Sequence, residues 1–164
     1  MTLAIRGATP SDSALIYQFI RDLADYEKLL HKVSATEQAI ADILFGASPR
    51  AFCDIAELDG KPVGFAFWFY SVSTFHGRHG IYLEDLFVKP EARGAGAGKA
   101  LLRRLAQRCR EEGLSGMEWA VLDWNAPSIA FYDSLGATAK TEWITRRLDG
   151  AALERLAEGV PAKA

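Results

Sequence analysis

Apolar residues recur along the chain with two spacings, and each spacing predicts one kind of element. A spacing of three or four residues predicts helices that begin near Ser11, Thr36 and Lys99. Ser11 and Thr36 are suited to capping the first amides of a helix, and Gly46 and Gly113 follow the ends of the second and third helices. The predicted helices cover residues 11–23, 36–45, 99–112, 129–135 and part of 150–159.

Shorter and denser apolar runs predict strands. They cover residues 2–6, 51–58, 61–72, 82–88, 117–123 and 143–149. Asp59-Gly60 separates the second run from the third and is typical of a tight hairpin turn. The third run carries four consecutive aromatic residues, 67–70, so we expect it to be central in its sheet or covered on both faces. Strands that alternate with helices predict one domain, residues 1–164, of the α/β (α+β) class, with a mixed, largely antiparallel sheet flanked by helices.

Composition and charge narrow the classes of partner. The 164 residues carry a formal net charge of −2, and without a basic excess we expect no nucleic-acid partner. Cys53 and Cys109 stand far apart and belong to no Cys-x-x-Cys motif. The histidines form no ligand pattern either, so we expect neither a disulfide scaffold nor a metal site.

The apolar runs are short compared with a membrane span. The longest, residues 63–70, has about the length of a strand, whereas a span needs roughly 18 residues. The first residues turn polar too early for a signal peptide. We therefore expect a soluble cytoplasmic protein without a membrane partner.

A glycine-rich segment, residues 93–98, lies between the predicted strand 82–88 and the helix that begins at Lys99. Glycine has no Cβ, so it adopts left-handed conformations readily and lets a bulky anion approach the backbone. The helix adds unpaired N–H groups and the positive end of its dipole. Together these features predict a phosphate or pyrophosphate site. The expected binding residues are Arg93, Gly94, Gly96, Gly98 and Lys99.

Glycine spacing separates the kinds of phosphate loop. A Walker loop needs Ser or Thr after Gly-Lys, but Ala100 follows Lys99. A dinucleotide fingerprint needs its third glycine one position later than Gly98 stands. A plain, tightly packed connection is the structural alternative. The order Arg93-Gly94-x-Gly96-x-Gly98, after an apolar strand that ends in Val88, resembles the acetyl-CoA pyrophosphate loop of the GNAT superfamily of N-acetyltransferases. The resemblance implies the GNAT acyl-CoA N-acyltransferase fold and acetyl-CoA as cosubstrate, with no metal.

Glu84 and Asp85 lie inside the apolar strand that precedes the glycine-rich segment. Carboxylates are costly to bury without a partner, so this position favours holding a cationic amine or relaying its proton. A primary amine with a pKa of about 10.4 must lose a proton before it attacks a thioester. Neighbours in a strand point to opposite faces, so only one acid would face the substrate unless a bulge re-aims them. We expect Glu84 to be the base and Asp85 to bind substrate charge; solvated edge acids or an ion pair with arginine are the alternatives.

The segment Asn125-x-Pro-Ser-x-x-Phe131-Tyr132 resembles the part of an acetyltransferase that closes over the coenzyme. A thiol has a pKa of about 8.5 and a phenol about 10, so a tyrosine hydroxyl near the sulfur can donate to the departing thiolate. Tyr132 is therefore the expected acid, and Asn125 an expected coenzyme-binding residue. The structural alternatives are that Tyr132 only packs against neighbouring side chains and that Asn125 only forms a turn.

Nearly the whole chain resembles the spermidine/spermine branch of the GNAT superfamily, which includes thialysine acetyltransferases. The resemblance is carried by residues 23–27, 82–88 and 125–132. It implies that Tyr26, Glu27, Glu84 and Asp85 contact or deprotonate the amine, and that Tyr132 acts on the thiolate. It also implies backbone contacts to the coenzyme at Phe87 and Val88, and a homodimer.

One departure from this branch concerns the acceptor. Where polyamine enzymes of the branch resemble Asp-Pro-Trp, this chain has Ser73-Thr74-Phe75, followed by Arg78. An amine that also bears a carboxylate could find a partner in Arg78, so we expect a lysine-like amino acid or a diamine or polyamine as acceptor. A protein-lysine acetyltransferase and a noncatalytic acyl-CoA sensor are the alternatives.

Overall fold

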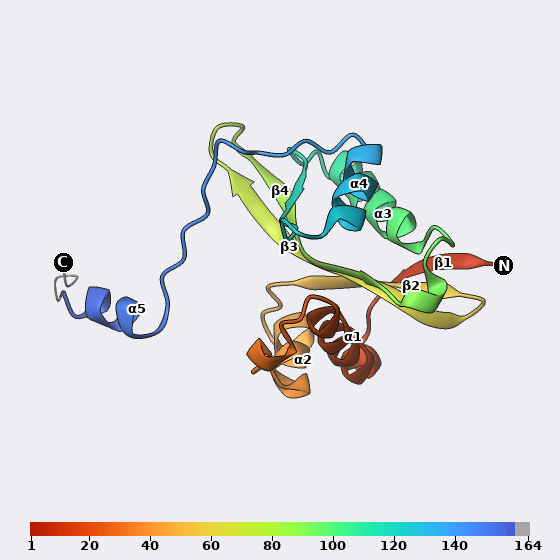
Figure 1. Cartoon of the computed structure of the whole chain (residues 1–164), viewed down its shortest axis with the longest axis horizontal. Coiled ribbons are helices and arrows are strands. Elements are labelled where there is room, and N and C mark those ends of the chain that lie inside the picture. Colours follow the sequence, from red (N-terminus) through yellow and green to blue (C-terminus); the bar gives the residue numbers. More distant parts are fainter. Residues whose placement is uncertain (160–164) are drawn as a thin grey trace. The chain divides into compact units, whose positions relative to one another are not determined.

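The computed structural model describes residues 1–159, drawn in Figure 1. The chain divides into two compact units, residues 1–120 and residues 121–164. The first unit contains the sheet with three α-helices, and the described part of the second contains two α-helices. The single-domain organisation expected from the sequence stays a prediction.

The first unit is built on a five-stranded sheet with the order β1-β2-β3-β4-β5. Its strands are β1 (Leu3–Gly7), β2 (Phe52–Leu58), β3 (Lys61–Ser73), β4 (Arg78–Val88) and β5 (Met117–Trp119). The first four pair antiparallel with their neighbours, and β5 pairs parallel with β4. The mixed, largely antiparallel sheet and the central place of β3 are thus confirmed. β5 ends at Trp119, so the prediction that this strand extends to residue 123 was wrong.

Helices cover both faces of this sheet. Figure 1 shows α1 (Ser13–Tyr26) and α2 (Glu37–Phe45) on one face and α3 (Ala97–Glu111) on the other. Thr36 caps α2 as predicted, since its hydroxyl oxygen accepts a hydrogen bond from the Ala39 N–H at 3.1 Å. Ser11 does not cap α1, because a 3-10 turn (Pro10–Asp12) precedes the helix and Asp12 takes the N-cap position.

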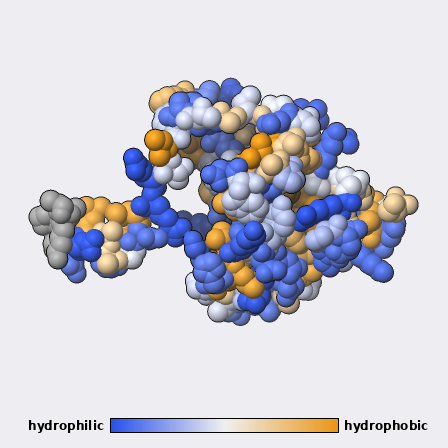
Figure 2. Space-filling model, viewed as in Figure 1, coloured by the Kyte–Doolittle hydropathy of each residue, from blue (hydrophilic) through white to orange (hydrophobic). Residues whose placement is uncertain are grey.

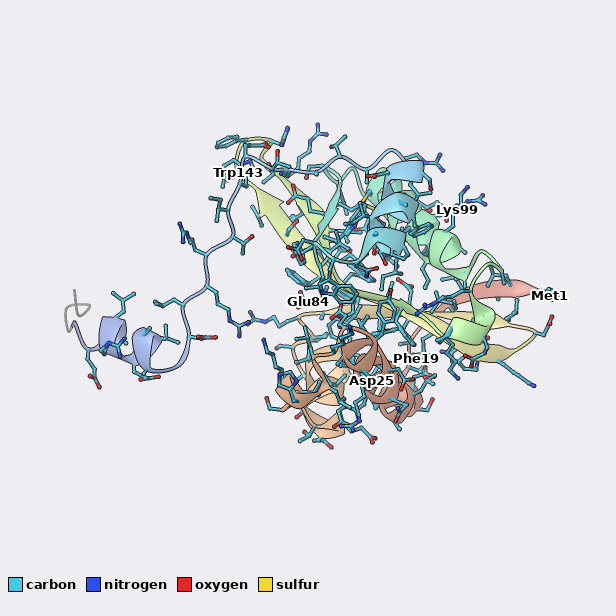
Figure 3. The ribbon with its side chains drawn as sticks, viewed as in Figure 1. Met1, Phe19, Asp25, Glu84, Lys99 and Trp143 are labelled. Atoms are coloured by element: carbon cyan, nitrogen blue, oxygen red, sulfur yellow. The ribbon has the colours of Figure 1, made fainter. Side chains whose placement is uncertain are left out.

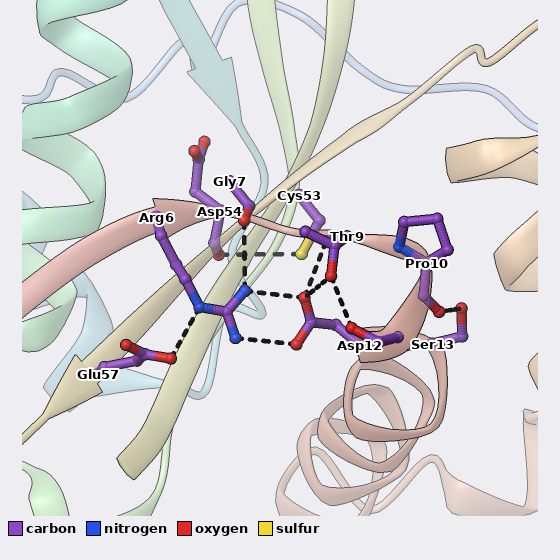
Figure 4. A network of polar contacts seen from close by, with 10 residues as sticks. Arg6, Gly7, Thr9, Pro10, Asp12, Ser13, Cys53, Asp54 and Glu57 are labelled. Atoms are coloured by element: carbon purple, nitrogen blue, oxygen red, sulfur yellow. Dashed lines mark hydrogen bonds and ion pairs between the residues drawn. The ribbon is translucent and has the colours of Figure 1, made fainter. Parts of the chain in front are cut away.

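Asp12 begins a polar network that ties the start of α1 to the sheet (Figure 4). Arg6 of β1 donates to both carboxylate oxygens of Asp12 at 2.8 Å and to Glu57 of β2 at 2.7 Å. The Thr9 N–H donates to the same carboxylate at 2.8 Å. The hydrogen bond from Arg6 is the main reason that the pKa of Asp12 falls to about 2. The network stabilises the 3-10 turn that displaces the predicted cap.

Two apolar layers lie on the two faces of the sheet. The layer under α1 and α2 contains Phe19, whose ring stacks on Phe65 with centroids 5.5 Å apart. Under α3, the fully buried side chains include Leu101 and Leu105. Because both faces are covered, β3 tolerates its consecutive aromatic residues.

The second unit contains α4 (Ala126–Ser134) and α5 (Gly150–Ala157). Both helices were predicted, with α4 starting three residues earlier than expected. Among its described residues there is no strand, so the strand predicted at 143–149 was wrong. A strand needs a hydrogen-bonded neighbour, and here Trp143 and Ile144 stay 69% and 75% exposed. Figure 2 shows further hydrophobic side chains along the segment that carries α5, where Leu156 is exposed.

Candidate active site

Strand β4 is irregular at the predicted base. Phe67 of β3 pairs with Asp85, but the next residue, Trp68, pairs with Leu83. Glu84, labelled in Figure 3, is therefore an extra residue in β4 and forms a β-bulge. This is the condition under which both acids can serve one substrate.

The bulge exchanges the faces of β4 on either side of it. Asp85 lies opposite Phe67, which belongs to the core under α1 and α2. Leu83 lies opposite Trp68, whose ring is covered by the guanidinium of Arg108 of α3 at 4.9 Å. In a regular strand, residues two positions apart share a face. In β4, Leu83 and Asp85 lie on opposite faces of the sheet, and Asp85 faces the side covered by α1.

The charges of two other carboxylates act on Asp85, and the three form an acidic cluster, defined as Glu27, Glu84 and Asp85. Burial, together with the charges of Glu84 and Glu27, raises the pKa of Asp85 from its usual 3.8 to about 7. Burial also raises the pKa of Glu27, which follows the last residue of α1. Glu84 itself is exposed. Such a cluster stabilises a positive charge and can accept a proton near neutral pH.

Tyr82 borders the acidic cluster, although its sequence context marked it only as part of a strand. Its ring packs on Phe69 with centroids 5.2 Å apart. Burial, and then the charge of Glu84, raises the pKa of its hydroxyl. An apolar strand with a tyrosine has no distinctive pattern, so only the bulged geometry identifies this neighbour.

Two glycines of the predicted phosphate loop have left-handed backbone conformations. Gly94 has a φ of 82° and Gly96, the N-cap of α3, a φ of 85°. Gly98 lies within α3, so left-handed geometry applies to the first two glycines only. The Ala100 N–H is the first to bond within α3, to the Gly96 carbonyl at 2.9 Å. The preceding amides, residues 97–99, are the unpaired donors that an anion site requires.

Charged side chains flank this loop. Lys99, labelled in Figure 3, is exposed in the first turn of α3. Arg93 donates from Nε to the Val88 carbonyl at 3.2 Å, and its guanidinium carbon lies 4.8 Å from the centre of the Tyr26 ring. Tyr26 is the last residue of α1 and precedes Glu27. The loop is therefore connected, through the contact of Arg93 with Tyr26, to the residue that precedes Glu27 of the acidic cluster.

The edge of β4 opens beside the loop. β5 pairs with β4 only through Ile81–Leu83, so in the described part of the chain residues 84–88 have no strand partner on that edge. Phe87 is 5% exposed and its ring packs 6.0 Å from that of Phe19, so its side chain belongs to the core. The backbone groups of Phe87 stay at this edge, and the predicted backbone contacts of Phe87 and Val88 to the coenzyme stay predictions.

Asn125 and Tyr132 belong to the second unit. The Asn125 side chain is buried and caps α4, accepting a hydrogen bond from the Ser128 N–H at 3.3 Å. Tyr132 lies on α4, with its ring 5.4 Å from that of Phe131. The site residues that the structure brings together are thus those of the first unit, and the roles of Asn125 and Tyr132 stay predictions.

The distance along β4 between Arg78 and Glu84 argues against Arg78 as the partner of an acceptor carboxylate within one chain. β4 runs from Arg78 to Val88, so about 20 Å of strand separates Arg78 from Glu84. Side chains stand nearly perpendicular to a sheet, so they do not close this gap along the strand. A lysine-like amino acid spans only about 8 Å from its ε-nitrogen to its carboxylate.

Residues 1–159 contain neither a cluster of metal-ligating side chains nor a membrane-spanning helix. No group of three or more histidine, cysteine, aspartate or glutamate side chains there has an arrangement that could hold a metal ion. No helix in the same range is both long and apolar enough to cross a bilayer. Cys53 and Cys109 are both free thiols.

Curated proteins similar to this chain are acetyltransferases. A thialysine N-epsilon-acetyltransferase of Bos taurus is 40% identical, over 93% of this chain and 96% of that protein. The corresponding protein of Caenorhabditis elegans is 33% identical, over 92% and 94%. An L-ornithine N5-acetyltransferase of Arabidopsis thaliana is 28% identical, over 93% and 86%.

Solved structures agree on the fold. An integron cassette protein from the mobile metagenome of V. cholerae superposes with a TM-score of 0.79 at 27% identity, covering 96% of this chain and 99% of that one. An aminoglycoside acetyltransferase from a soil metagenome gives a TM-score of 0.75 at 19% identity, covering 90% and 95%. The family model described as "Acetyltransferase (GNAT) family" matches residues 16–137, a range that includes the bulged strand, the glycine loop and α4. With the left-handed glycines and the acidic cluster inside that match, this chain belongs to the acetyltransferase (GNAT) family.

Proposed function

We propose that this chain transfers the acetyl group of acetyl-CoA to a primary amine of a small molecule, by direct attack of the amine on the thioester. One observation carries the proposal: an acidic cluster that attracts a cation adjoins a loop that offers backbone amides to an anion. The amides of residues 97–99, with Arg93 and Lys99, would hold the pyrophosphate. Backbone groups at the open edge of β4 would form hydrogen bonds with the part of acetyl-CoA that leads from the pyrophosphate to the thioester.

Amine activation is assigned to the acidic cluster. Glu84, on the bulge, is the proposed base, acting directly or through a water molecule. Asp85, with a pKa of about 7, is a second group able to take a proton at neutral pH. Tyr26 and Glu27 complete the proposed amine site from the end of α1.

The chemical step conserves protons. The neutral nitrogen attacks the carbonyl carbon, the C–S bond breaks, and its electron pair leaves with sulfur. The new amide nitrogen gives its proton to the acidic cluster, the Tyr132 hydroxyl gives one to the thiolate in our proposal, and solvent returns a proton to Tyr132. A phenol with a pKa of about 10 is a weaker acid than a thiol with a pKa of about 8.5, so the hydroxyl first stabilises the developing thiolate by a hydrogen bond, and the site must favour the proton transfer that follows.

The acceptor that we propose is a lysine-like amino acid or a diamine. Relatives named as thialysine and L-ornithine acetyltransferases support the amino-acid choice. A human protein named spermidine/spermine N(1)-acetyltransferase-like protein 1 is 36% identical over 81% of this chain and 20% of that protein, so polyamines are included among the acceptors to be tested. From the resemblance to this branch we further propose a cytoplasmic homodimer with neither nucleic-acid nor membrane partners.

The test is acetyl-CoA-dependent thiol release with spermidine, thialysine, lysine, ornithine and a lysine peptide. Free thiols of the protein, Cys53 and Cys109, are subtracted as background. We expect release with the small amines, and at least a hundredfold loss of turnover in Glu84→Gln if the carboxylate is the base. Release with the peptide alone would favour a protein substrate. Acetyl-CoA binding without release in any reaction would favour a sensor.

A further inference from the structure

The contact between Arg93 and Tyr26 joins segments that lie far apart in the sequence. Tyr26 ends α1 and precedes Glu27, whereas Arg93 precedes the left-handed glycines. The guanidinium carbon lies 4.8 Å from the centre of the tyrosine ring, within the range of a cation–π contact. The contact therefore joins the amine side of the site to its coenzyme side.

Arg93 is anchored on a third element as well. Its Nε donates to the carbonyl of Val88, the last residue of β4, at 3.2 Å. This bond uses one of the five donors of a guanidinium. An anion bound at the neighbouring loop can accept from the others, in the bidentate manner typical of arginine. Binding there would immobilise the guanidinium, and with it the ring that it covers.

The backbone closes the end of α1 in a Schellman motif, in which the Leu29 N–H bonds to the Ala24 carbonyl at 2.7 Å. The Glu27 N–H bonds to the Leu23 carbonyl and the Lys28 N–H to the Asp25 carbonyl, both at 2.9 Å. Lys28 has a φ of 61°, which is unusual for a residue with a side chain. These bonds close the last turn, but helix ends are the parts that fray first, so a side-chain contact at Tyr26 adds to the order of this turn.

We propose that Arg93 is a positioning residue for the acceptor amine: its guanidinium holds Tyr26 and the end of α1 in place, so that amine binding depends on the state of the coenzyme loop. The inference rests on the proposed acetyl transfer and adds a link between its two sites. Coenzyme binding and amine binding then strengthen each other, because linkage between two sites is reciprocal.

The test is a double-mutant cycle. Arg93→Lys keeps the positive charge for the coenzyme but removes the planar group that stacks on the ring. At saturating acetyl-CoA we expect the amine KM to rise about threefold, and any change of kcat to be the same in the wild-type and Tyr26→Leu backgrounds. The same rise is expected in a Tyr26→Phe background, which keeps a ring, but not in a Tyr26→Leu background. Arg93→Lys should change the Kd of acetyl-CoA, measured by calorimetry, by the same factor in the wild-type, Tyr26→Phe and Tyr26→Leu backgrounds.

The matched control is Arg21→Lys. Arg21 also lies over a tyrosine of α1, Tyr17, at 5.9 Å, so it reproduces the kind of contact without the link to the loop. Its amine KM should equal that of the wild type. An equal rise of KM for Arg93→Lys in the Tyr26→Leu background would overturn the proposal.

A readout without turnover separates this proposal from the function itself. Hydrogen exchange of the Glu27 and Lys28 amides should be about threefold faster in Arg93→Lys and unaltered in Arg21→Lys. If the wild type acetylates no amine, the proposed function fails, and the exchange rates still decide whether Arg93 holds the end of α1. Unaltered exchange in Arg93→Lys would refute the positioning role.

Discussion

Asp85 is a residue whose chemistry opposes the stability of the fold. Its carboxylate is half-buried beside two other acids, and its pKa rises from 3.8 to about 7. Above pH 7 the folded protein must keep this group ionised in an unfavourable place, whereas the unfolded chain ionises it freely. A raised pKa of an acid therefore lowers stability as the pH climbs from about 4 to about 7, and the loss is complete above that window.

We predict that Asp85→Asn stabilises the protein while it impairs amine turnover. At pH 8 the free energy of unfolding should increase by about 2 to 4 kcal/mol, and at pH 4 it should hardly change. Urea unfolding at the two pH values measures both quantities. Asp25→Asn, which removes an exposed carboxylate from the last turn of α1, serves as the control. An equal effect at pH 4 and pH 8 would show that charge is not the cause.

The proposed role of Tyr132 as the acid predicts an effect on turnover and not on coenzyme binding. Replacing its hydroxyl in Tyr132→Phe leaves the ring, so coenzyme affinity should stay within about twofold. If the hydroxyl protonates the thiolate, kcat should fall by about a hundredfold or more. Steady-state kinetics with calorimetric binding of acetyl-CoA separates the two effects. Unchanged turnover would remove Tyr132 as the acid.

At the scale of elements, the loop before α3 depends on backbone conformation rather than on space. A Cβ at Gly96 would meet no atom within 4 Å, but the φ of 85° strains any residue with a side chain. We predict that Gly96→Val weakens acetyl-CoA binding at least tenfold, because the loop must leave its left-handed shape or block the anion. Gly77→Val tests strain alone, since Gly77 has a φ of 60° and equal space. This control should lose stability but bind acetyl-CoA normally; a similar loss of binding in both would argue against the cradle.

Elements with local signals were predictable from the sequence. Asp59 and Gly60 both have positive φ values, 49° and 75°, as the hairpin signal requires. The cap by Thr36 also depends on neighbours in the sequence. The strand expected at 143–149 has an apolar pattern but no neighbour to pair with, and pattern alone does not supply one.

The site was predictable in its chemistry and not in its contacts. Glycine spacing indicated the loop, and two acids in an apolar strand indicated the amine site. The bulge at Glu84 adds a single unpaired residue and leaves no mark in the sequence, so the face of Asp85 could not be foreseen. The contact of Arg93 with Tyr26 depends on how α1 packs beside β4, which no local pattern encodes.

For the whole molecule, two carboxylates with opposite shifts predict how stability depends on pH. Asp12 has its pKa lowered from 3.8 to about 2 by the hydrogen bonds of Arg6, so it stabilises the fold above pH 4 and loses this effect as the pH falls toward 2. Asp85 acts in the opposite sense between about pH 4 and 7. We predict a stability maximum near pH 4 to 5 in unfolding experiments. Asp12→Asn should remove the decline on the acid side, at a loss of about 2 kcal/mol near pH 5; a maximum above pH 7 would contradict this assignment.

The bulge has a further consequence for how such a protein can change over time. Leu83 and Asp85 both have partners on β3, whereas Glu84 between them has none. Because residue 84 does not pair with β3, we expect a substitution there to change the proposed amine site and to leave the register of the sheet unaltered. A chain of this design can therefore lose the proposed amine activation through one substitution at Glu84 while the strand pairing that supports the fold is kept.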